Sequence, residues 1–483
     1  MKLASLLAGY PLKFTTVNLP TKIHGFSADS RKIKPGYLYI CIRGENEDGH
    51  GFVQQAVEQG ASVIVSQKFL QLSVPIILVE DTRHFLSFFA DSFFNHPSQK
   101  IQITGITGTN GKTTTAHYLH EIYQAAEQQS ALMGTCGVKT RQQYRQTQCL
   151  TTPGAEELHN ILWQLQLSGV QQLAMEVSSH ALVQKRVEHC RFHAAIFTNL
   201  TREHLDYHQT MDDYFAAKAH LFALLAAREG NAIINADDKW AIKLTKQIAA
   251  PFITFGLENK ADVRAEKITS LTKGGSVLNV ASPWGKLSFT LYLPGLYNIY
   301  NALGAATAAL MDNLTLQEVT KGLEALRVVP GRLELLPSPP GVQVYVDYAH
   351  TPDGLEKVLQ TVTAYPHHRI ILVFGCRGRR DRGKRPAMGV VADHYADIVV
   401  LTTDNPVEED PETIAQDITS AMQKKPIFLA DRQEAIHYAL AAASDGDIVL
   451  ITGKGREDYQ LVGAATIPYS DLHAVESFVN SMH

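Results

Sequence analysis

The chain has 483 residues, of which 45% are hydrophobic and 19% charged, and its formal net charge is −4. The length suggests about three domains. The near-neutral charge provides neither a basic nucleic-acid-binding surface nor a disordered acidic tail, so we expect small-molecule substrates and no nucleic-acid partner. No Cys-x-x-Cys pair occurs, which favours a reducing compartment and leaves no legible zinc site. The five cysteines are Cys41, Cys136, Cys149, Cys190 and Cys376.

The amino-terminal run MKLASLLAGYPLKF is interrupted by Pro11 and Lys13 and lacks a small-residue cleavage site, so it predicts a first helix. No stretch approaches the ~20 apolar residues that span a bilayer, and we expect a cytoplasmic protein without a membrane span. From Ile23 to about Phe94, β-rich runs alternate with helical runs such as Phe52–Gln59. This pattern predicts a small α/β domain over residues 1–97, with strands at Tyr37–Ile42, Ala61–Val65 and Ile76–Val79.

The run TGTNGKTTT, Thr107–Thr115, lies between the apolar stretch Ile101–Ile106 and the helical pattern His117–Ala126. A glycine-rich turn that opens a helix directs several N–H groups and the positive end of the helix dipole at one spot, which favours phosphate. Lys112 would reach the β- and γ-phosphates and the Thr113 hydroxyl would complete a magnesium shell. Gly105 and Gly111 enclose five residues instead of the usual four. The run therefore predicts a variant nucleoside-triphosphate loop; a chance turn with a surface lysine is the alternative.

Further along, short apolar strands alternate with helical patterns at Glu156–Gln166 and Tyr214–Ala226. This alternation predicts a doubly wound parallel sheet whose ligand site lies at the carboxyl ends of the strands. Alternating β residues between Pro251 and Leu293 predict a small antiparallel insert, followed by a helix at Asn298–Met311. We place this central domain at residues 98–329, with strands at Gln171–Val177, Ala194–Leu200 and Ala232–Ile234.

Proline-rich boundaries at Pro330–Gly331 and Pro337–Gly341 precede a second, Rossmann-like parallel sheet, which we place at residues 330–483. Polar segments follow four of its strands and should therefore meet at one edge of the sheet. Arginine forks bind carboxylate or phosphate bidentately, so this edge should hold an anionic ligand, unless it is a solvated basic face. The strands are Val342–Tyr348, Arg369–Phe374, Ile398–Leu401, Ile427–Leu429 and Ile448–Thr452, and the segments are DYAHTPD, CRGRRDRGKRP, DNPVEEDP and GKGRED.

Three further side chains are candidates for metal chemistry. Glu176 ends a predicted strand and could hold a metal on the triphosphate, or could cap a helix or pair with a cation. His204, in the loop TNLTREHLDYH, could serve a second metal as a neutral imidazole, or could belong to a polar capping loop. Lys218 lies in the apolar helix YFAAKAHLF, where periodicity alone favours a lysine that extends along the surface to reach water.

The order of the motifs resembles the Mur ligase family nearly end to end, most closely the MurE type, which adds the third amino acid of the peptidoglycan stem peptide. The segments that carry the resemblance are DSRKIKPGYLYICIRG, GTNGKTT, LTTP, MEVSSHALVQKRV, TNLTREHLDYH, YFAAKAHLF, GRLE, VDYAHTPDGL, GKRP, DNP and GKGREDYQ. The resemblance implies an ATP-dependent, amide-bond-forming ligase with a three-domain α/β fold. It would phosphorylate the D-glutamate carboxylate of UDP-N-acetylmuramoyl-L-alanyl-D-glutamate, which an amine then attacks, and so serve cell wall biogenesis, cell shape and cell division within the cell cycle.

Matched by position, the resemblance also implies site residues and cofactors. The cofactors are ATP, two Mg²⁺ ions and a CO₂-derived carbamate on Lys218, and Lys112, His204 and Lys218 are catalytic. The implied ATP contacts are Gly108, Thr109, Asn110, Gly111, Lys112, Thr113, Thr114, Asn301, Arg332, Asp347 and His350. The implied metal ligands are Thr113, Glu176, His204 and Lys218. The implied UDP-substrate contacts are Ser30, Thr151, Thr152, Ser178, Gln184 and Arg186. The implied amino-acid contacts are Arg380, Asp404, Asn405, Val407, Gly453, Arg456 and Glu457.

Val407 departs from the family pattern, because diaminopimelate-adding members have an arginine there that binds the distal carboxylate. Its absence favours lysine, but Arg377, Arg379 and Arg456 are additional arginines. We hypothesise that Arg456 replaces the missing contact and favour meso-diaminopimelate as the added amino acid, with L-lysine as the alternative. We expect a monomer.

Two other functions remain open. A folylpolyglutamate-synthetase-like ligase shares the GTNGK loop but would lack the UDP-sugar residues. A non-catalytic ATP-switch protein would bind ATP to change shape and form no amide product.

Overall fold

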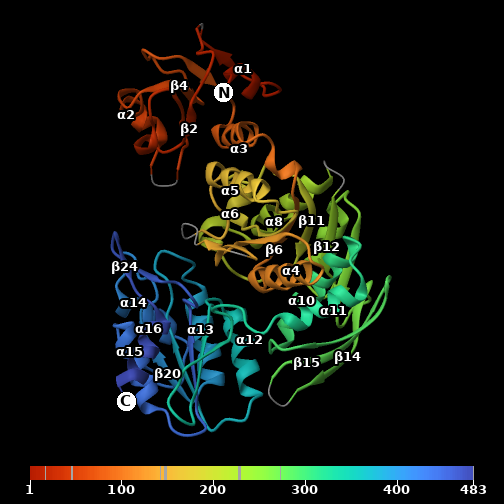
Figure 1. The fold of residues 1–483 in the computed structure, drawn as a ribbon. Helices are drawn as coiled ribbons and strands as arrows, with labels where there is room; N and C mark the ends of the chain where they lie inside the picture. Colours follow the sequence, from red (N-terminus) through yellow and green to blue (C-terminus); the bar gives the residue numbers. More distant parts are fainter. Residues whose placement is uncertain are drawn as a thin grey trace. The chain divides into compact units, whose positions relative to one another are not determined.

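The computed structural model describes most of the chain, and Figure 1 labels its helices and strands. The described residues are 1–16, 18–44, 47–141, 143–145, 150–226, 230–271 and 274–481. The chain forms two compact units. The first comprises Met1–Gly105, Gln129–Ala195 and His220–Gly230, and the second comprises Ile106–Gln128, Ile196–Ala219 and Asn231–His483. Cys41 and Cys376 are buried free thiols, and Cys149 lies outside the described residues.

The amino-terminal sheet has five strands in the order β1-β5-β4-β3-β2, parallel except where β1 joins β5. Phe85 and Phe89 of α3 are fully buried in its core, and Asp81 caps the first turn of that helix. The predicted α/β pattern and first helix are confirmed. The elements are α1 (Leu3–Leu6), β1 (Phe14–Thr15), β2 (Gly25–Ser27), η1 (Ser30–Lys32), β3 (Tyr37–Ile40), η2 (Gly49–Phe52), α2 (Val53–Glu58), β4 (Ala61–Ser66), β5 (Ile76–Leu78), α3 (Thr82–Phe93) and η3 (Pro97–Gln99).

The central sheet has eleven strands in the order β16-β15-β14-β13-β12-β11-β6-β10-β7-β8-β9. Its strands are β6 (Gln102–Thr107), β7 (Ser130–Gly134), β8 (Gly137–Thr140), β9 (Tyr144–Arg145), β10 (Gln172–Glu176), β11 (Phe192–Phe197), β12 (Asn231–Asn235), β13 (Phe252–Gly256), β14 (Val263–Ser270), β15 (Ser276–Ser282) and β16 (Gly285–Leu291). The antiparallel insert starts later than predicted, because β13 still pairs in parallel with β12 and β14, and the antiparallel pairs of the insert are β14–β15 and β15–β16. The strands β7, β8 and β9 at the other edge also pair antiparallel.

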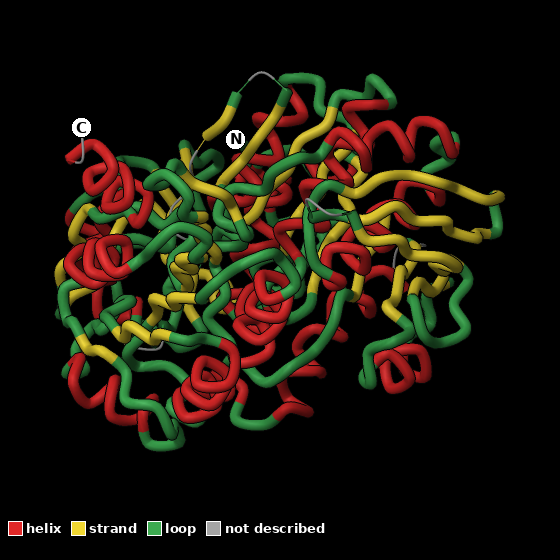
Figure 2. Tube along the Cα trace, turned by 90° about the horizontal axis from the view of Figure 1, so that it is seen from below, coloured by secondary structure: helices red, strands yellow, loops and turns green. Residues whose placement is uncertain are grey.

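Helices follow most of the parallel strands of this sheet along the chain, and Figure 2 draws helices in red and strands in yellow. They are α4 (Lys112–Ala125), α5 (Ala155–Leu167), α6 (Ser179–Val183), α7 (Leu205–His208), α8 (Met211–Ala226), α9 (Ala241–Gln247), α10 (Leu296–Met311) and α11 (Leu316–Ala325). The helix α4 begins at Lys112, five residues before the apolar pattern that predicted it, so the nucleotide loop runs directly into its first turn.

The carboxy-terminal sheet has the order β17-β18-β22-β19-β20-β21 and is parallel except for the edge strand β17. Its strands are β17 (Glu334–Leu336), β18 (Gln343–Asp347), β19 (Ile370–Phe374), β20 (Ile398–Leu401), β21 (Ile427–Phe428) and β22 (Ile448–Thr452), and β23 (Tyr459–Val462) and β24 (Ala465–Pro468) form a separate hairpin. The helices are α12 (Pro352–Thr363), α13 (Lys384–Tyr395), α14 (Pro411–Thr419), α15 (Arg432–Ala442) and α16 (Asp471–Ser481).

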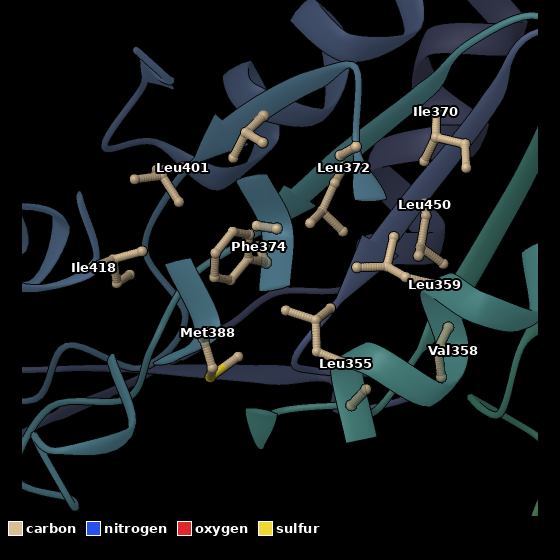
Figure 3. Packing of buried hydrophobic residues seen from close by; sticks show 14 of the residues in the cluster. Leu355, Val358, Leu359, Ile370, Leu372, Phe374, Met388, Leu401, Ile418 and Leu450 are labelled. Atoms are coloured by element: carbon tan, nitrogen blue, oxygen red, sulfur yellow. The ribbon is translucent and has the colours of Figure 1, made fainter. Parts of the chain in front are cut away.

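Helices cover both faces of this sheet. Successive side chains of a strand point to opposite faces, so the apolar strands contribute side chains to a core on each face. Leu372 and Phe374 pack with Leu355 and Leu359 of α12 and with Met388 of α13 (Figure 3). The side chains between them in sequence, such as Val373, pack against α15 and α16 instead. The predicted doubly wound α/β fold is confirmed. No helix among the described residues is both long and apolar enough to cross a bilayer.

Candidate active site

The nucleotide loop joins β6 to α4 and depends on two glycines with positive φ. Gly108 has φ +152° and Gly111 has φ +89°, and a Cβ added at either position would collide with Thr198 Oγ1 or Asn301 Oδ1. Gly111 is the N-cap of α4 and provides no side-chain cap, so no N-cap side chain competes with an anion at the start of that helix. The loop therefore fits a phosphate, as the sequence predicts.

Asn110 is tied to neighbouring loops. Its N–H donates to Asn199 Oδ1 (2.9 Å), its side-chain amide donates to Asp353 Oδ2 (2.8 Å), and its carbonyl accepts from Thr198 Oγ1 (2.7 Å). Thr109, Thr113 and Thr114 are each at most 5% exposed. The loop is thus held rigidly from outside, which preorganises it for its ligand.

Two lysines converge on one carbonyl of this loop. Lys112 Nζ donates to the carbonyl oxygens of Gly108 and Thr109 (both 2.9 Å), and Lys218 Nζ donates to the Gly108 carbonyl (2.7 Å). Lys218 is 1% exposed, so the expectation of a surface lysine was wrong: α8 points this residue at the loop. Burial, reinforced by the Lys112 charge, lowers the pKa of Lys218 well below its ordinary value. The amine of Lys218 is therefore readily available in its neutral form.

A buried carboxylate lies between two histidines of the second unit. Glu203 Oε1 is 2.6 Å from His350 Nε2, and Glu203 Oε2 is 3.5 Å from His204 Nε2. Burial opposes ionisation of Glu203, but His204 and His350 outweigh it and hold its pKa well below the ordinary value. His350 Nδ1 faces the Tyr348 carbonyl at 2.8 Å, so both ring nitrogens are engaged. Glu203 was not among the predicted site residues, although it directly precedes His204 in the loop that was.

The other predicted nucleotide contacts lie around the first turn of α4. Arg332 Nη2 donates to Thr113 Oγ1 (2.8 Å), and Asn301 lies beside Gly111 on α10. Asp347 behaves differently: its carboxylate accepts from the N–H groups of Leu333 (2.6 Å) and Ala349 (2.7 Å), and burial raises its pKa. Asp347 therefore positions the backbone next to Arg332.

In the first unit, the structure brings together most of the residues predicted to bind the UDP substrate. Thr152 Oγ1 donates to the Glu176 carbonyl (2.9 Å) and accepts from the Ser178 N–H (3.0 Å). Arg186 donates to the Thr152 carbonyl (2.7 Å) and to Gln184 Oε1 (2.7 and 3.1 Å). The strand β10 delivers Glu176 to this cluster, and α6 begins within it.

Thr135 links Glu176 to Thr151. Thr135 donates to the Glu176 carboxylate through its N–H (3.0 Å) and hydroxyl (3.2 Å), and its hydroxyl lies 3.1 Å from Thr151 Oγ1. Ser30 is not part of this cluster: it lies in η1, and its hydroxyl donates to Gln55 Oε1 of α2 (2.7 Å).

The segments after β20 and β22 form a cluster of charged and polar side chains. Glu457 Oε2 accepts from Asn405 Nδ2 (3.1 Å) and from Lys454 Nζ (3.1 Å), and Lys454 also donates to Asn405 Oδ1 (3.2 Å). Asp404 Oδ1 is buried without a hydrogen bond within the described structure and lies 3.8 Å from Lys454 Nζ, and Gly453 leaves room beside Asp404. A buried carboxylate oxygen without a hydrogen bond is costly and suits a ligand ammonium.

Sequence reasoning missed Lys454, although it stands between the two glycines of the predicted GKG segment and is fully buried. The predicted convergence of the polar segments is confirmed, because the Gly378 N–H donates to the Asn405 carbonyl (2.9 Å) and the Gly453 N–H to the Asp347 carbonyl (3.1 Å).

Three further residues that were predicted to contact the amino acid have other partners in the structure. Arg380 pairs with Asp206 at 3.4 Å. Val407 has φ +57°, a left-handed conformation that is unusual for a β-branched residue, and it is held by the Leu461 carbonyl and the Gly463 N–H. Arg456 forms a two-fold ion pair with Glu334, including Nε to Oε2 at 2.8 Å. The hypothesis that Arg456 receives a second carboxylate stays a prediction, and this ion pair counts against it.

Magnesium is compatible with the donors present. No group of three or more His, Cys, Asp or Glu in the described part of the chain is arranged to hold a metal by itself. Mg²⁺ typically takes one or two protein oxygens and completes its shell with substrate phosphates and water. The Thr113 hydroxyl, beside the phosphate loop in the second unit, is an oxygen donor of this kind, and so, in the first unit, is the Glu176 carboxylate. Each of these residues taken by itself has a donor that suits Mg²⁺.

Models of the Mur ligase family match three successive segments of the chain. The segments correspond to the Mur ligase family catalytic domain (residues 22–94), the Mur ligase middle domain (residues 106–309) and the Mur ligase glutamate ligase domain (residues 331–455).

Similar proteins cover nearly the whole chain. A protein of Geobacillus thermodenitrificans named UDP-N-acetylmuramoyl-L-alanyl-D-glutamate--2,6-diaminopimelate ligase is 40% identical over 98% of each chain. A protein of the same name from Listeria monocytogenes is 39% identical over 98% of this chain and 97% of its own. A solved structure with this enzyme name is 32% identical, covers 96% of each chain and superposes with a TM-score of 0.66.

Proposed function

Because the chain belongs to the Mur ligase family, we propose that it is an ATP-dependent ligase that adds 2,6-diaminopimelate to UDP-N-acetylmuramoyl-L-alanyl-D-glutamate. The observation that carries this proposal is the presence, within the second unit, of both a phosphate loop and a buried carboxylate oxygen that could accept from an amino acid. The loop presents Lys112 and the N-terminus of α4, and the carboxylate oxygen is Asp404 Oδ1. A ligase that activates one carboxylate and joins it to an amine needs both.

The reaction follows from the chemistry of a carboxylate, which has no leaving group. Transfer of the γ-phosphoryl group of ATP to the D-glutamate side chain gives an acyl phosphate and ADP. The amino group of diaminopimelate then attacks the acyl carbon, and the tetrahedral intermediate expels phosphate and forms the amide. Lys112 and the N–H groups of Gly111–Thr113 would stabilise the charge that develops on the transferred group.

We assign metal and carbamate roles by family position. Thr113 and His204 of the second unit and Glu176 of the first are the proposed Mg²⁺ ligands, and Mg²⁺ would neutralise charge on the phosphates. Lys218 would join them as a carbamate: its neutral amine adds CO₂ and loses a proton, which turns a cation into an anionic oxygen donor. The lowered pKa of Lys218 supports this role, because only the neutral amine is nucleophilic. Intact-protein mass spectrometry in bicarbonate, with Lys218→Arg as control, tests the modification.

The remaining assignments also rest on family position. Residues 1–97 would bind the UDP-substrate, residues 98–329 would bind ATP and residues 330–483 would bind the amino acid. Ser30 and the cluster around Thr152, Ser178, Gln184 and Arg186 would hold the UDP-dipeptide. We propose a cytoplasmic monomer.

The test is a product analysis. The enzyme is incubated with ATP, Mg²⁺, the UDP-dipeptide and, in separate reactions, meso-diaminopimelate or L-lysine, and each product is weighed by mass spectrometry. We expect ADP release only when all substrates are present, together with a new amide that contains diaminopimelate, and we expect Lys112→Ala to abolish both. Phosphate release without an amide would support an ATP switch, use of a folate would support the other ligase class, and a lysine product alone would overturn the choice of amino acid.

A further inference from the structure

Six arginines lie in the segments that follow β19 and β22, and the structure commits five of them to carboxylates. Arg379 pairs with Glu408, Arg380 with Asp206, Arg382 with Asp417, Arg385 with Glu409 and Asp417, and Arg456 with Glu334. The sixth, Arg377, makes no side-chain hydrogen bond and no ion pair within the described structure, and it is half-buried. A half-buried arginine that has no carboxylate partner can receive a carboxylate that a ligand supplies.

The backbone places Arg377 beside the segment that carries Asp404 and Asn405. The neighbouring Gly378 donates its N–H to the Asn405 carbonyl (2.9 Å), and a Cβ at Gly378 would collide with the Pro406 carbonyl. Asn405 in turn donates to Glu457 Oε2 (3.1 Å). On the other side, Cys376 is buried with its Sγ against Met388. Arg377 therefore lies between the buried Cys376 and Gly378, whose backbone contacts the Asn405–Pro406 segment.

The charges near Arg377 divide into two kinds. Asp404 Oδ1 has no hydrogen bond and would accept one from an ammonium, whereas the nearby Lys454 is already held by Asn405 and Glu457. Arg377 is then the remaining cation for a carboxylate. An amino acid whose far end carries both an ammonium and a carboxylate matches this pair of charges, and 2,6-diaminopimelate has such an end while L-lysine has only the ammonium.

We infer that Arg377 is the specificity-determining residue that receives the distal carboxylate of the added amino acid. It would take the role of the arginine that diaminopimelate-adding members have at the position of Val407. This inference rests on the proposed function, because it requires a dicarboxylic diamino acid as the substrate. A bidentate guanidinium–carboxylate pair is a strong, charge-assisted interaction, so its loss should weaken binding of diaminopimelate and leave the use of ATP and UDP-dipeptide unaltered.

The test compares steady-state kinetics of wild-type, Arg377→Gln, Arg377→Lys and Arg379→Gln enzymes with meso-diaminopimelate and L-lysine. Arg379 is the matched control, since it lies two residues away and is paired with Glu408. We expect Arg377→Gln to raise the KM for diaminopimelate on the order of 10- to 100-fold with a small change in kcat, and to lower the preference over lysine by the same factor. Arg377→Lys should be intermediate, because it keeps the charge and loses the fork.

The outcomes separate the inference from the function on which it rests. A wild-type enzyme that adds diaminopimelate and an Arg377→Gln variant with unchanged KM would overturn the role of Arg377 and leave the proposed function intact. The same loss in Arg379→Gln would also overturn it, since the effect would then follow from the charge of the whole segment. A wild-type enzyme that adds only lysine would overturn both. An unchanged KM for ATP confirms that the variants are folded.

Discussion

Gly111 is a position of the nucleotide loop that does not accommodate a Cβ, and Gly111→Ala should damage both stability and ATP use. Its φ of +89° is strained for any residue with a Cβ, and the Cβ would collide with Asn301 Oδ1 and lie 3.2 Å from Asn301 Cγ. Asn301 cannot easily yield, because its amide donates to Asn298 Oδ1 (3.0 Å) within α10.

The expected magnitude combines two penalties. A residue forced into a sparsely populated backbone region costs about 1–3 kcal/mol, and overpacking of a buried site costs about 1–3 kcal/mol, so the folded state should lose roughly 2–6 kcal/mol. Each kcal/mol lowers Tm by about 2–4 °C in a domain of 150–250 residues. We therefore expect a fall of at least about 4 °C. If the loop shifts to relieve the collision, its N–H groups leave the phosphate, and the KM for ATP should rise about tenfold or more.

Gly154→Ala is the matched control. Gly154 is the N-cap of α5, also without a side-chain cap, but its φ is −61° and no atom lies within 4 Å of an added Cβ. Any cost of alanine at an N-cap is therefore common to both variants. Thermal melts and ATP titrations in the full reaction measure the difference. Equal Tm values for the two variants, with an unchanged KM for ATP, would refute the reasoning.

Two further changes probe buried charges. Burial lowers the pKa of His159 from 6.5 to about 3, and the Asp91 carboxylate, 3.5 Å away, does not offset it. Below pH 6.5 the unfolded chain therefore binds more protons than the folded one, so the free energy of unfolding should fall by about 2 kcal/mol between pH 7 and pH 5. Thermal melts of His159→Gln at different pH values should lack this contribution. If the free energy of unfolding of this variant had the same slope against pH as the wild type, the result would contradict the reasoning. Glu203→Gln removes the charge beside His350 and should lower kcat/KM for ATP about tenfold or more; stopped-time assays with wild-type values would exclude a positioning role.

Much of the fold could be predicted from the sequence because it depends on the local pattern of apolar and polar residues. The strands β4, β10, β19 and β22 and the helix α5 match their expected ranges closely, since continuous apolar runs and 3.6-residue periodicity report directly on burial. The start of α4 was missed, because Lys112–Ala116 carries loop chemistry rather than an apolar pattern. β13 was wrongly assigned to the antiparallel insert for a similar reason. Whether a strand pairs parallel or antiparallel depends on its neighbouring strand, and the residues of one strand do not indicate it.

The sequence by itself determined the phosphate loop, the alternation of strands and helices and the order of polar segments, because each depends on residues close together in the chain. Only the tertiary structure decided which charged side chains have a partner within the protein. Lys218 is buried against the Gly108 carbonyl, 110 positions away, and Arg456 is held by Glu334, 122 positions away, whereas Arg377 has no such partner among the described residues. The free energy of a charged side chain depends on the partner and the solvent that the fold brings to it, and that partner is set by packing between distant segments.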